Sequence, residues 1–165
     1  MCIRDRYIVT EQHPLIKERN QKGLPEMGVL RDSDASWYMR EEAGGLILGP
    51  YEPGAPACYV NAPDQNSEYE LFQEDLERIS EHIESAIKRV PIFGELGVKR
   101  VYNGAIAYTP DGSPIIGPAW DLKNFWINEG HSFGVTAAGG AGWQLAEWII
   151  AVSYTHLRAH ETLVH

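Results

Sequence analysis

The segment NEGHSFGVTAAGGAG, residues 128–142, decides the fold that the sequence predicts. It follows a short apolar run at 125–127 and precedes apolar residues at helical spacing between 143 and 150. We therefore predict a buried strand, a glycine-rich loop over 130–142 and a helix behind it. Such junctions bind ligands in open α/β sheets, because loop amides and the positive end of the helix face an anionic or electron-rich group. Tight helix–strand packing is the alternative explanation for the glycines.

The chain before this segment predicts strands. Residues 7–10 form a β-prone run, and residues 36–41 and 46–49 flank a glycine pair as an antiparallel hairpin. Alternation along the first hairpin strand places Tyr38 and Arg40 on one face of the sheet. A further strand is predicted at 98–108, followed by a tight turn at Pro110-Asp111-Gly112 and short strands at 115–117 and 125–127.

One amphipathic helix is predicted between residues 68 and 90. Apolar residues recur there at intervals of three and four, the period of one helix face. Ser67 and Glu70 predict a capping box, and Pro91 ends the helix. The segment carries seven acidic and three basic residues. A solvated outer helix face explains this charge, and an acidic binding surface is the alternative.

Composition narrows the classes of function. The 165 residues are 44% apolar and 22% charged, as in a soluble globular protein, and no apolar run reaches the roughly 18 residues of a membrane span. The net charge of −9 argues against nucleic acid as a partner, since phosphates are neutralised by clustered Lys and Arg. Only Cys2 and Cys58 occur, without CxxC spacing, so neither a metal site nor a disulfide framework is predicted.

The two ends do not continue the pattern. Residues 1–6 (MCIRDR) and 152–165 resemble translated edges of assembled sequence fragments, and we expect neither to belong to the natural protein. For the C-terminal end, a histidine-rich metal-binding tail is the alternative.

Several motifs, in the same order and spacing, resemble the dimethylglycine/sarcosine dehydrogenase branch of the D-amino-acid-oxidase-like FAD-dependent oxidoreductases. They are residues 30–32 (LRD), 37–42 (WYMREE), 44–52 (GGLILGPYE), 103–104 (NG), 108–118 (YTPDGSPIIGP) and 130–148. The resemblance implies an α/β (α+β) fragment of the oxidase unit. Residues 7–98 would be part of a substrate domain, a mostly antiparallel sheet with an amphipathic helix. Residues 99–151 would be the C-terminal strand, loop and helix of a Rossmann-like FAD-binding domain.

The family chemistry is oxidation of an N-methylated glycine, dimethylglycine or sarcosine, with hydride transfer to FAD. The resemblance implies that backbone groups of the 132–137 loop stabilise the flavin; these residues are Ser132, Phe133, Gly134, Val135, Thr136 and Ala137. It implies that Tyr38 faces the substrate, although a plain hairpin tyrosine is the alternative. Arg31 and Arg40 are candidates for holding the substrate carboxylate, with surface ion pairs as the alternative.

The sequence also departs from the family pattern. Related oxidases have a lysine in the flavin loop, but residues 129–142 contain none, and the GxGxxG unit that binds the FAD pyrophosphate is absent. We therefore expect this chain alone to be inactive. A C-terminal extension absent here would bind tetrahydrofolate. The expected location is the cytoplasm for a bacterial protein and the mitochondrial matrix for a eukaryotic one. A flavin-free interaction module that uses the acidic helix or the proline-rich loop at 50–67 is the alternative function.

Overall fold

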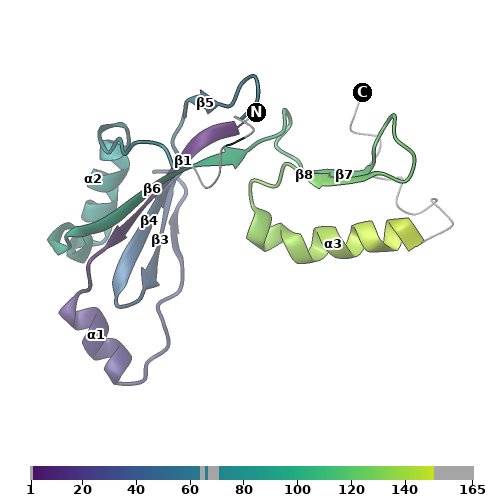
Figure 1. Cartoon of the computed structure of the whole chain (residues 1–165). Coiled ribbons are helices and arrows are strands. Elements are labelled where there is room, and N and C mark those ends of the chain that lie inside the picture. The colour runs from purple at the N-terminus through teal and green to yellow at the C-terminus, as the bar shows by residue number, and fades with distance from the viewer. Residues whose placement is uncertain (1, 64–65, 67–70, 151–165) are drawn as a thin grey trace. The chain divides into compact units, whose positions relative to one another are not determined.

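The computed structural model describes residues 2–63, 66 and 71–150 (Figure 1). The chain divides into two compact units, one formed by residues 2–106 and one that begins at Ala107. Each unit is described by itself below. The described residues of the two units are mixed α/β, with mostly antiparallel sheets and three α-helices, which confirms the coarse fold prediction.

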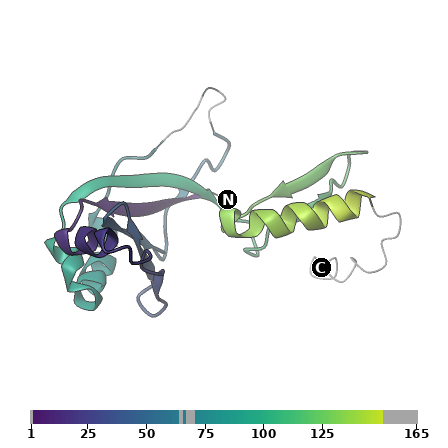
Figure 2. The same cartoon turned by 90° about the horizontal axis from the view of Figure 1, so that it is seen from below.

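The first unit is built on a six-stranded sheet. Its strands are β1 (Cys2–Thr10), β2 (Leu30–Asp32), β3 (Trp37–Glu42), β4 (Gly45–Pro50), β5 (Ala57–Cys58) and β6 (Val98–Ala107). The order is β2-β3-β4-β1-β5, and β6 also pairs with β1. Consequently β6 runs alongside β1 although nearly ninety residues of sequence separate their ends (Figure 2).

The predicted hairpin is confirmed as β3 and β4. Tyr38 lies opposite Gly49, and Glu42 lies opposite Gly45 next to the turn. The turn residues Ala43 and Gly44 have φ values of 48° and 81°. Two consecutive positive φ values match the right-handed twist of the flanking strands, which is why a short turn suffices here.

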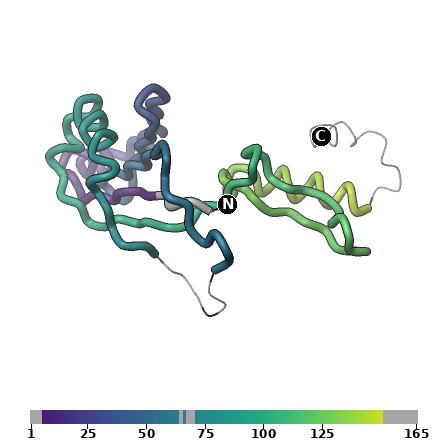
Figure 3. The backbone as a smooth tube through the Cα atoms, turned by 90° about the horizontal axis from the view of Figure 1, so that it is seen from above, coloured from purple at the N-terminus to yellow at the C-terminus, as the bar shows by residue number. Residues whose placement is uncertain are grey.

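Helical segments cover one face of this sheet (Figure 3). They are α1 (Pro14–Gln21), α2 (Ser80–Arg89) and the 3₁₀ turns at Glu77–Ile79 and Pro91–Glu95. Trp37 and Met39 are buried in the core with Ile79 and Ala86. Trp37 also donates its indole N–H to Ser85 Oγ at 3.1 Å. The even-numbered residues of β3 lie on the other face, as the alternation predicts.

The predicted helix over 68–90 is wrong in its first half. Helical structure begins at Glu77, and residues 71–76 are not helical. Instead, the Phe72 N–H donates to the carbonyl of Asn103 at 2.7 Å, and the Asn103 side chain donates to the carbonyl of Gln73 at 2.6 Å. These long-range hydrogen bonds hold the segment beside β6 and override its local helical period. The predicted capping box lies outside the described residues, and the predicted end before Pro91 is confirmed.

Two local features near the N-terminus differ from the prediction. The first strand starts at Cys2 rather than at Tyr7, and Arg6 is only 2% exposed. Residues 14–21 form α1 in a polar stretch for which the sequence predicts no element; Pro14 occupies its first turn, and His13 Nδ1 accepts the Leu15 N–H at 3.2 Å. The prediction that both ends are non-native stays a prediction, and residues 152–165 lie outside the described residues.

The second unit is a hairpin packed on one helix. The strands β7 (Ile115–Pro118) and β8 (Trp126–Glu129) pair antiparallel, and α3 (Gly134–Ile150) lies along them. The buried strand predicted at 125–127 is present as β8 but is not buried. The helix α3 covers only part of it, and Phe125 remains 54% exposed. The helix begins earlier than predicted. Gly139, Gly140 and Gly142 are therefore helical rather than part of a loop.

In the part of the chain that the structure describes, no helix has the length and apolar character needed to cross a membrane.

Candidate functional site

The predicted flavin loop lies at the start of α3. Ser132 and Phe133 precede the helix, and Gly134, Val135 and Thr136 form its first turn. The Ala137 N–H donates to the Phe133 carbonyl at 2.9 Å and is the first helical hydrogen bond of this end. The backbone N–H groups of 134–136 lie ahead of that bond, where a helix has no internal acceptors for them. They are the groups through which this end can bind a ligand.

The loop that leads into this helix end packs against the turn at 109–113. A Cβ on Gly130, which has a φ of 74°, would lie 2.5 Å from Thr109 Cγ2. Thr109 Oγ1 donates to the Ser113 carbonyl at 2.6 Å, within the predicted turn. The Ser113 N–H donates to Asp111 Oδ1 at 3.0 Å, and the single Thr109 hydroxyl proton is shared between this oxygen and the Ser113 carbonyl; these hydrogen bonds lower the pKa of the Asp111 carboxyl. The turn and the loop are therefore packed together.

Two observations fit this helix end to an electron-rich ligand edge. Val135 is 99% exposed, and a Cβ on Gly134 would meet nothing closer than His131 Cβ at 3.9 Å. The amides are thus open to approach, and the helix dipole favours negative charge there. The neighbouring His131 already has a hydrogen-bond partner for its Nε2 atom, which lies 2.6 Å from Asn128 Oδ1.

Tight helix–strand packing does not explain the glycines of α3 within the described residues. Positions 139, 140 and 142 have nothing within 4 Å of a built Cβ. Close packing occurs at Gly117 instead, where a Cβ would lie 2.9 Å from the ring of Trp148.

A second candidate site lies on the face of the first unit's sheet opposite the core. Tyr38 on β3 lies opposite Gly49 on β4, and one step along the Ile8–Leu48 register places Tyr7 of β1 on the other side of Gly49. Tyr7 in turn stacks on Tyr102 of β6, with ring centroids 4.7 Å apart and planes 24° apart. The result is a row of three tyrosines that crosses four strands.

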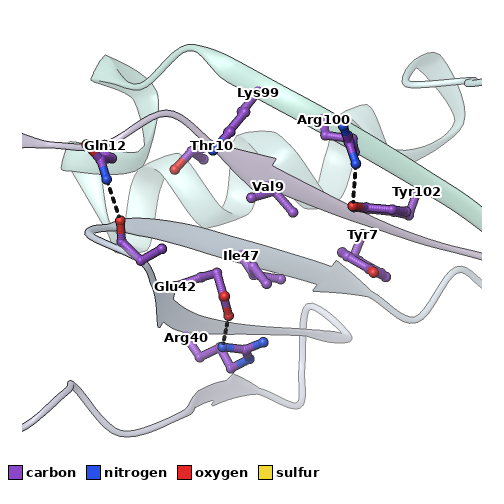
Figure 4. A pocket seen from close by; sticks show the side chains of 11 residues that line it. Tyr7, Val9, Thr10, Gln12, Arg40, Glu42, Ile47, Lys99, Arg100 and Tyr102 are labelled. Carbon is purple, nitrogen blue, oxygen red and sulfur yellow. Dashed lines mark hydrogen bonds and ion pairs between the residues drawn. The ribbon is translucent and has the colours of Figure 1, made fainter.

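A pocket of about 410 Å³ adjoins this row (Figure 4). Its lining comes from β1, β3, β4, β6 and the adjoining turns and comprises Tyr7, Val9, Thr10, Gln12, Arg40, Glu42, Ala43, Ile47, Lys99, Arg100 and Tyr102. Burial raises the pKa of Tyr7, and the neighbouring Tyr102 adds to this effect. Because a raised pKa keeps the phenol neutral, Tyr7 presents an uncharged ring and hydroxyl to the pocket.

The two arginines predicted to hold a carboxylate have other contacts. Arg40 forms an ion pair with Glu42, two residues along the same strand. The Arg31 guanidinium lies 5.2 Å from the ring centroid of Tyr51, and Tyr51 lies 5.8 Å from the ring of Tyr38. Sequence reasoning missed Tyr7, Arg100 and Tyr102. Alternation along β6 could have put Arg100 and Tyr102 on one face, but only the pairing of β6 with β1 brings them to Tyr7.

Among the described residues, no three His, Cys, Asp or Glu side chains are grouped so that they could hold a metal ion.

Comparison with known proteins shows the family to which the chain belongs. The family "FAD dependent oxidoreductase" (DAO) matches residues 1–148, and the chain belongs to that family. The fold agrees: L-proline dehydrogenase from P. horikoshii superposes with a TM-score of 0.64 at 24% identity, over 90% of this chain and 35% of that one. Glycine oxidase from Geobacillus kaustophilus superposes with a TM-score of 0.62 at 14% identity. At these identities the two structures show the fold alone.

Curated relatives show which branch of the family the chain is similar to. The chain is 36% identical to mitochondrial dimethylglycine dehydrogenase of Rattus norvegicus over 153 residues, which is 90% of this chain and 17% of that protein. It is 35% identical to mitochondrial sarcosine dehydrogenase of Homo sapiens over 144 residues, 87% of this chain and 16% of that protein. It is 34% identical to 4-methylaminobutanoate oxidase (formaldehyde-forming) of Paenarthrobacter nicotinovorans over 130 residues. The resemblance to the dimethylglycine and sarcosine dehydrogenases is therefore confirmed, and the chain spans less than a fifth of the length of these relatives.

Proposed function

We propose that this chain is part of an FAD-dependent amine oxidoreductase that oxidises an N-methylated glycine, dimethylglycine or sarcosine, by hydride transfer to the flavin. One observation carries the proposal. Relatives at 35% and 36% identity that share almost the whole chain are named for oxidation of these two substrates. Family membership supports this reading over a flavin-free interaction module, whose acidic helix is also shorter than the sequence predicts.

The two units would have different tasks. Residues 7–98 would contribute part of the substrate domain, and residues 99–151 would contribute the C-terminal part of the FAD-binding domain. The compactness of each unit supports this division, although β6 extends the first unit to Ile106. Oxidation needs both halves of such a site in place, so the chain alone would be inactive.

The start of α3 would hold the flavin. When bound, FAD supplies the acceptor for the hydride, which carries both electrons of the oxidation. Ser132 and Phe133 would contribute backbone groups at the loop, and the free amides of Gly134, Val135 and Thr136 would stabilise negative charge on the ring. The Ala137 N–H is hydrogen-bonded within the helix, so Ala137 would contact the flavin only through its methyl group.

Tyr38 would face the substrate. It lies on the open face of the sheet, at the end of the tyrosine row, and its ring is near both Gly49 and Tyr51. An aromatic face binds a methylated ammonium by a cation–π interaction, and a phenol hydroxyl donates to a carboxylate. Both interactions suit an N-methylated glycine.

Three further features of the proposal come from the resemblance. A C-terminal extension would bind tetrahydrofolate. The relatives are named as mitochondrial, which supports the mitochondrial matrix for a eukaryotic source and leaves the cytoplasm for a bacterial one. The partner would be a small methylated amine rather than a nucleic acid, consistent with the net charge of −9.

Substitution of Gly134 by valine tests the flavin site in the complete enzyme. A branched side chain at the first helical position would stand between the amides and the ring, so we expect lower flavin content and slower flavin reduction by dimethylglycine. Because a Cβ at Gly134 meets only His131 Cβ at 3.9 Å, the substitution should change the melting midpoint little. Gly139→Val, in the same helix, is the control and should keep the flavin. Full flavin occupancy with a normal reduction rate in Gly134→Val would contradict the proposal.

A further inference from the structure

An apolar pocket lies at the edge of the core, on the face of the first unit's sheet opposite the tyrosine row. It has a volume of about 250 Å³ and is lined by residues of α1, β2, β3, β4 and the 3₁₀ turn at Pro91–Glu95. An apolar cavity of about 150 Å³ is large enough to bind benzene, so this pocket has room for a ring or a short alkyl chain. Its apolar lining includes Leu15, Ile16, Met27, Leu30, Met39 and Ile92.

Part of this apolar lining is open to solvent. Leu15 on α1 is 62% exposed, and Leu30 on the outermost strand of the sheet is 38% exposed. Ile16 and Met39, which also line the pocket, are buried in the core. The pocket therefore has an accessible mouth and a buried wall. A ligand with an apolar part would be stabilised here by removing these carbons from water.

The segment that connects α1 to β2, residues 22–29, borders the pocket and is held in place by two hydrogen bonds. The Met27 N–H donates to Glu41 Oε2 at 3.0 Å, and Arg19 donates to the Pro25 carbonyl. The border of the pocket is thus fixed before a ligand arrives. Pre-organisation of this kind lowers the entropy cost of binding.

The charged groups of the lining favour an anionic head group. Within residues 2–63, 66 and 71–150, the side-chain contacts of Arg19 are made through Nη1, to the Pro25 carbonyl and to Glu41 at 3.9 Å. Its Nε and Nη2 donors remain for a ligand, and the side chain is 29% exposed.

The other two charged groups of the lining are less accessible to a ligand. Glu41 is buried, and its two oxygens accept hydrogen bonds from Met27 and Asn20. Arg40 forms an ion pair with Glu42. A carboxylate at the mouth of the pocket can therefore bind the guanidinium of Arg19, whereas an ammonium group finds no free acceptor of comparable strength.

We propose that this pocket binds a carboxylate with a medium-length alkyl chain, whose apolar part packs against Ile16 and Met39 and whose head group binds Arg19. The ligand is not the substrate of the proposed oxidation, because an N-methylated glycine has no alkyl chain to fill the pocket. The site lies on the face of the sheet away from Tyr38 and involves neither FAD nor the amine.

Nuclear magnetic resonance of the full 165-residue chain, labelled with ¹³C at the methionine methyl groups, tests the site. The chain has three methionines, and two of them, Met27 and Met39, line the pocket. Octanoate below its micelle concentration should shift both of these signals in a saturable way. Substitution of each methionine by leucine assigns the signals. Absence of a saturable shift overturns the proposal.

Chain length distinguishes binding in an apolar pocket from binding of an anion to the surface. From butanoate to octanoate, each added methylene should lower the dissociation constant by about fourfold while it finds room in the pocket. Acetate, which has no alkyl chain, should give no saturable shift. Equal dissociation constants for butanoate and octanoate would show that the chain is not buried.

Ligands with the same chain and other head groups test the role of Arg19. Octanoate should bind about fivefold more tightly than 1-octanol, and octylammonium should bind more weakly than either. Arg19→Gln should remove the advantage of octanoate and leave the binding of 1-octanol unchanged. Lys123→Gln removes a positive charge from the second unit and should change neither. Tighter binding of octylammonium than of octanoate would contradict the assignment of the head group to Arg19.

A negative charge on the pocket wall should abolish octanoate binding. Leu30→Asp places such a charge in the lining, and Leu15→Asp does so from α1 if the strand variant does not fold. Val60→Asp, at a residue that is 79% exposed and outside the pocket, is the matched control and should bind octanoate normally. Circular dichroism confirms that each variant is folded. Equal loss of binding in the control and in the pocket variants overturns the site. None of these measurements involves flavin, so failure here leaves the proposed function unaffected.

Discussion

The ring of Tyr38 lies directly over the backbone of Gly49 on the neighbouring strand. A Cβ on Gly49 would be 2.1 Å from Tyr38 Cζ and 2.5 Å from its hydroxyl oxygen. No side chain is compatible with this ring position. The absence of a side chain at 49 therefore decides where the proposed substrate-facing tyrosine lies.

Substitution of Gly49 by alanine should force the Tyr38 ring out of its position. Overpacking of this kind costs about 1–3 kcal/mol of unfolding free energy. Tyr38→Ala removes the ring, so adding Gly49→Ala in that background should cost little. A double-mutant cycle from urea unfolding measures the coupling. Gly28→Ala, where nothing lies within 4 Å, is the control. Equal costs of Gly49→Ala in both backgrounds would show that the ring is not the obstacle.

The buried arginine of β1 depends on Glu52. The Arg6 side chain is 1% exposed and forms an ion pair with Glu52, which also pairs with Arg78, while Asp75 lies 3.8 Å from Arg6. Glu52→Gln leaves the buried charge poorly compensated and should cost about 3 kcal/mol. Arg6→Met together with Glu52→Gln should recover part of this loss.

Chemical denaturation of Glu52→Gln and of the double variant with Arg6→Met tests this dependence. Glu42→Gln breaks the exposed Arg40–Glu42 pair and should cost less than about 1 kcal/mol. If Glu52→Gln is no more costly than Glu42→Gln, Arg6 does not need its partner.

Glu41 should make stability depend on acid pH. Its carboxylate is 2% exposed and accepts the Met27 N–H at 3.0 Å and the Asn20 side-chain amide at 2.6 Å. These hydrogen bonds lower its pKa from the ordinary value of 4.5, the Met27 bond most. A group with a lowered pKa stabilises the fold above its ordinary pKa, and this stabilisation is lost as pH falls through the lowered value.

Glu41→Gln should therefore reduce the unfolding free energy at pH 7 by about 1–3 kcal/mol, the cost of an unmatched buried hydrogen-bonding group. The difference from the parent chain should shrink as the pH falls from 4.5 through the lowered pKa of Glu41, since below that value the buried side chain is neutral in both proteins. Thermal melts between pH 7 and pH 3 measure the difference. Glu18→Gln, at an exposed ion pair with Lys22, is the control. A difference that does not change with pH would contradict the role of the carboxylate.

Two glycines of the second unit should respond in opposite directions to alanine. Gly140 is inside α3 with nothing within 4 Å of a built Cβ, so Gly140→Ala should stabilise the helix by about 0.5–1 kcal/mol. Gly117 has a φ of 142° and would place its Cβ 2.9 Å from the Trp148 ring, so Gly117→Ala should destabilise the hairpin–helix contact. Circular dichroism at 222 nm during thermal unfolding reports both. Loss of helix in Gly140→Ala would contradict this expectation, because it would show that another segment packs against α3 at Gly140 and leaves no room for a methyl group.

The sequence by itself determined the features that depend on neighbouring residues. The alternation in β3, the turn at Ala43–Gly44 and the end of α2 before Pro91 all follow from side-chain period and backbone preference within a few positions. The family resemblance was also readable, because motif order along the chain carries it. The placement of Tyr38 and Arg40 on one face of the sheet belongs to this group.

Tertiary structure decided whatever depends on pairing between distant segments. Residues 71–76 have a helical period, yet hydrogen bonds to Asn103 hold them beside β6, since a backbone N–H satisfied by another segment no longer needs a helix. Likewise, neither Tyr7 nor Arg100 stands out in the sequence. The pocket exists because β6 pairs with β1 and brings Tyr102 onto Tyr7, and the register between two strands so far apart in sequence is set by the packing of the whole sheet.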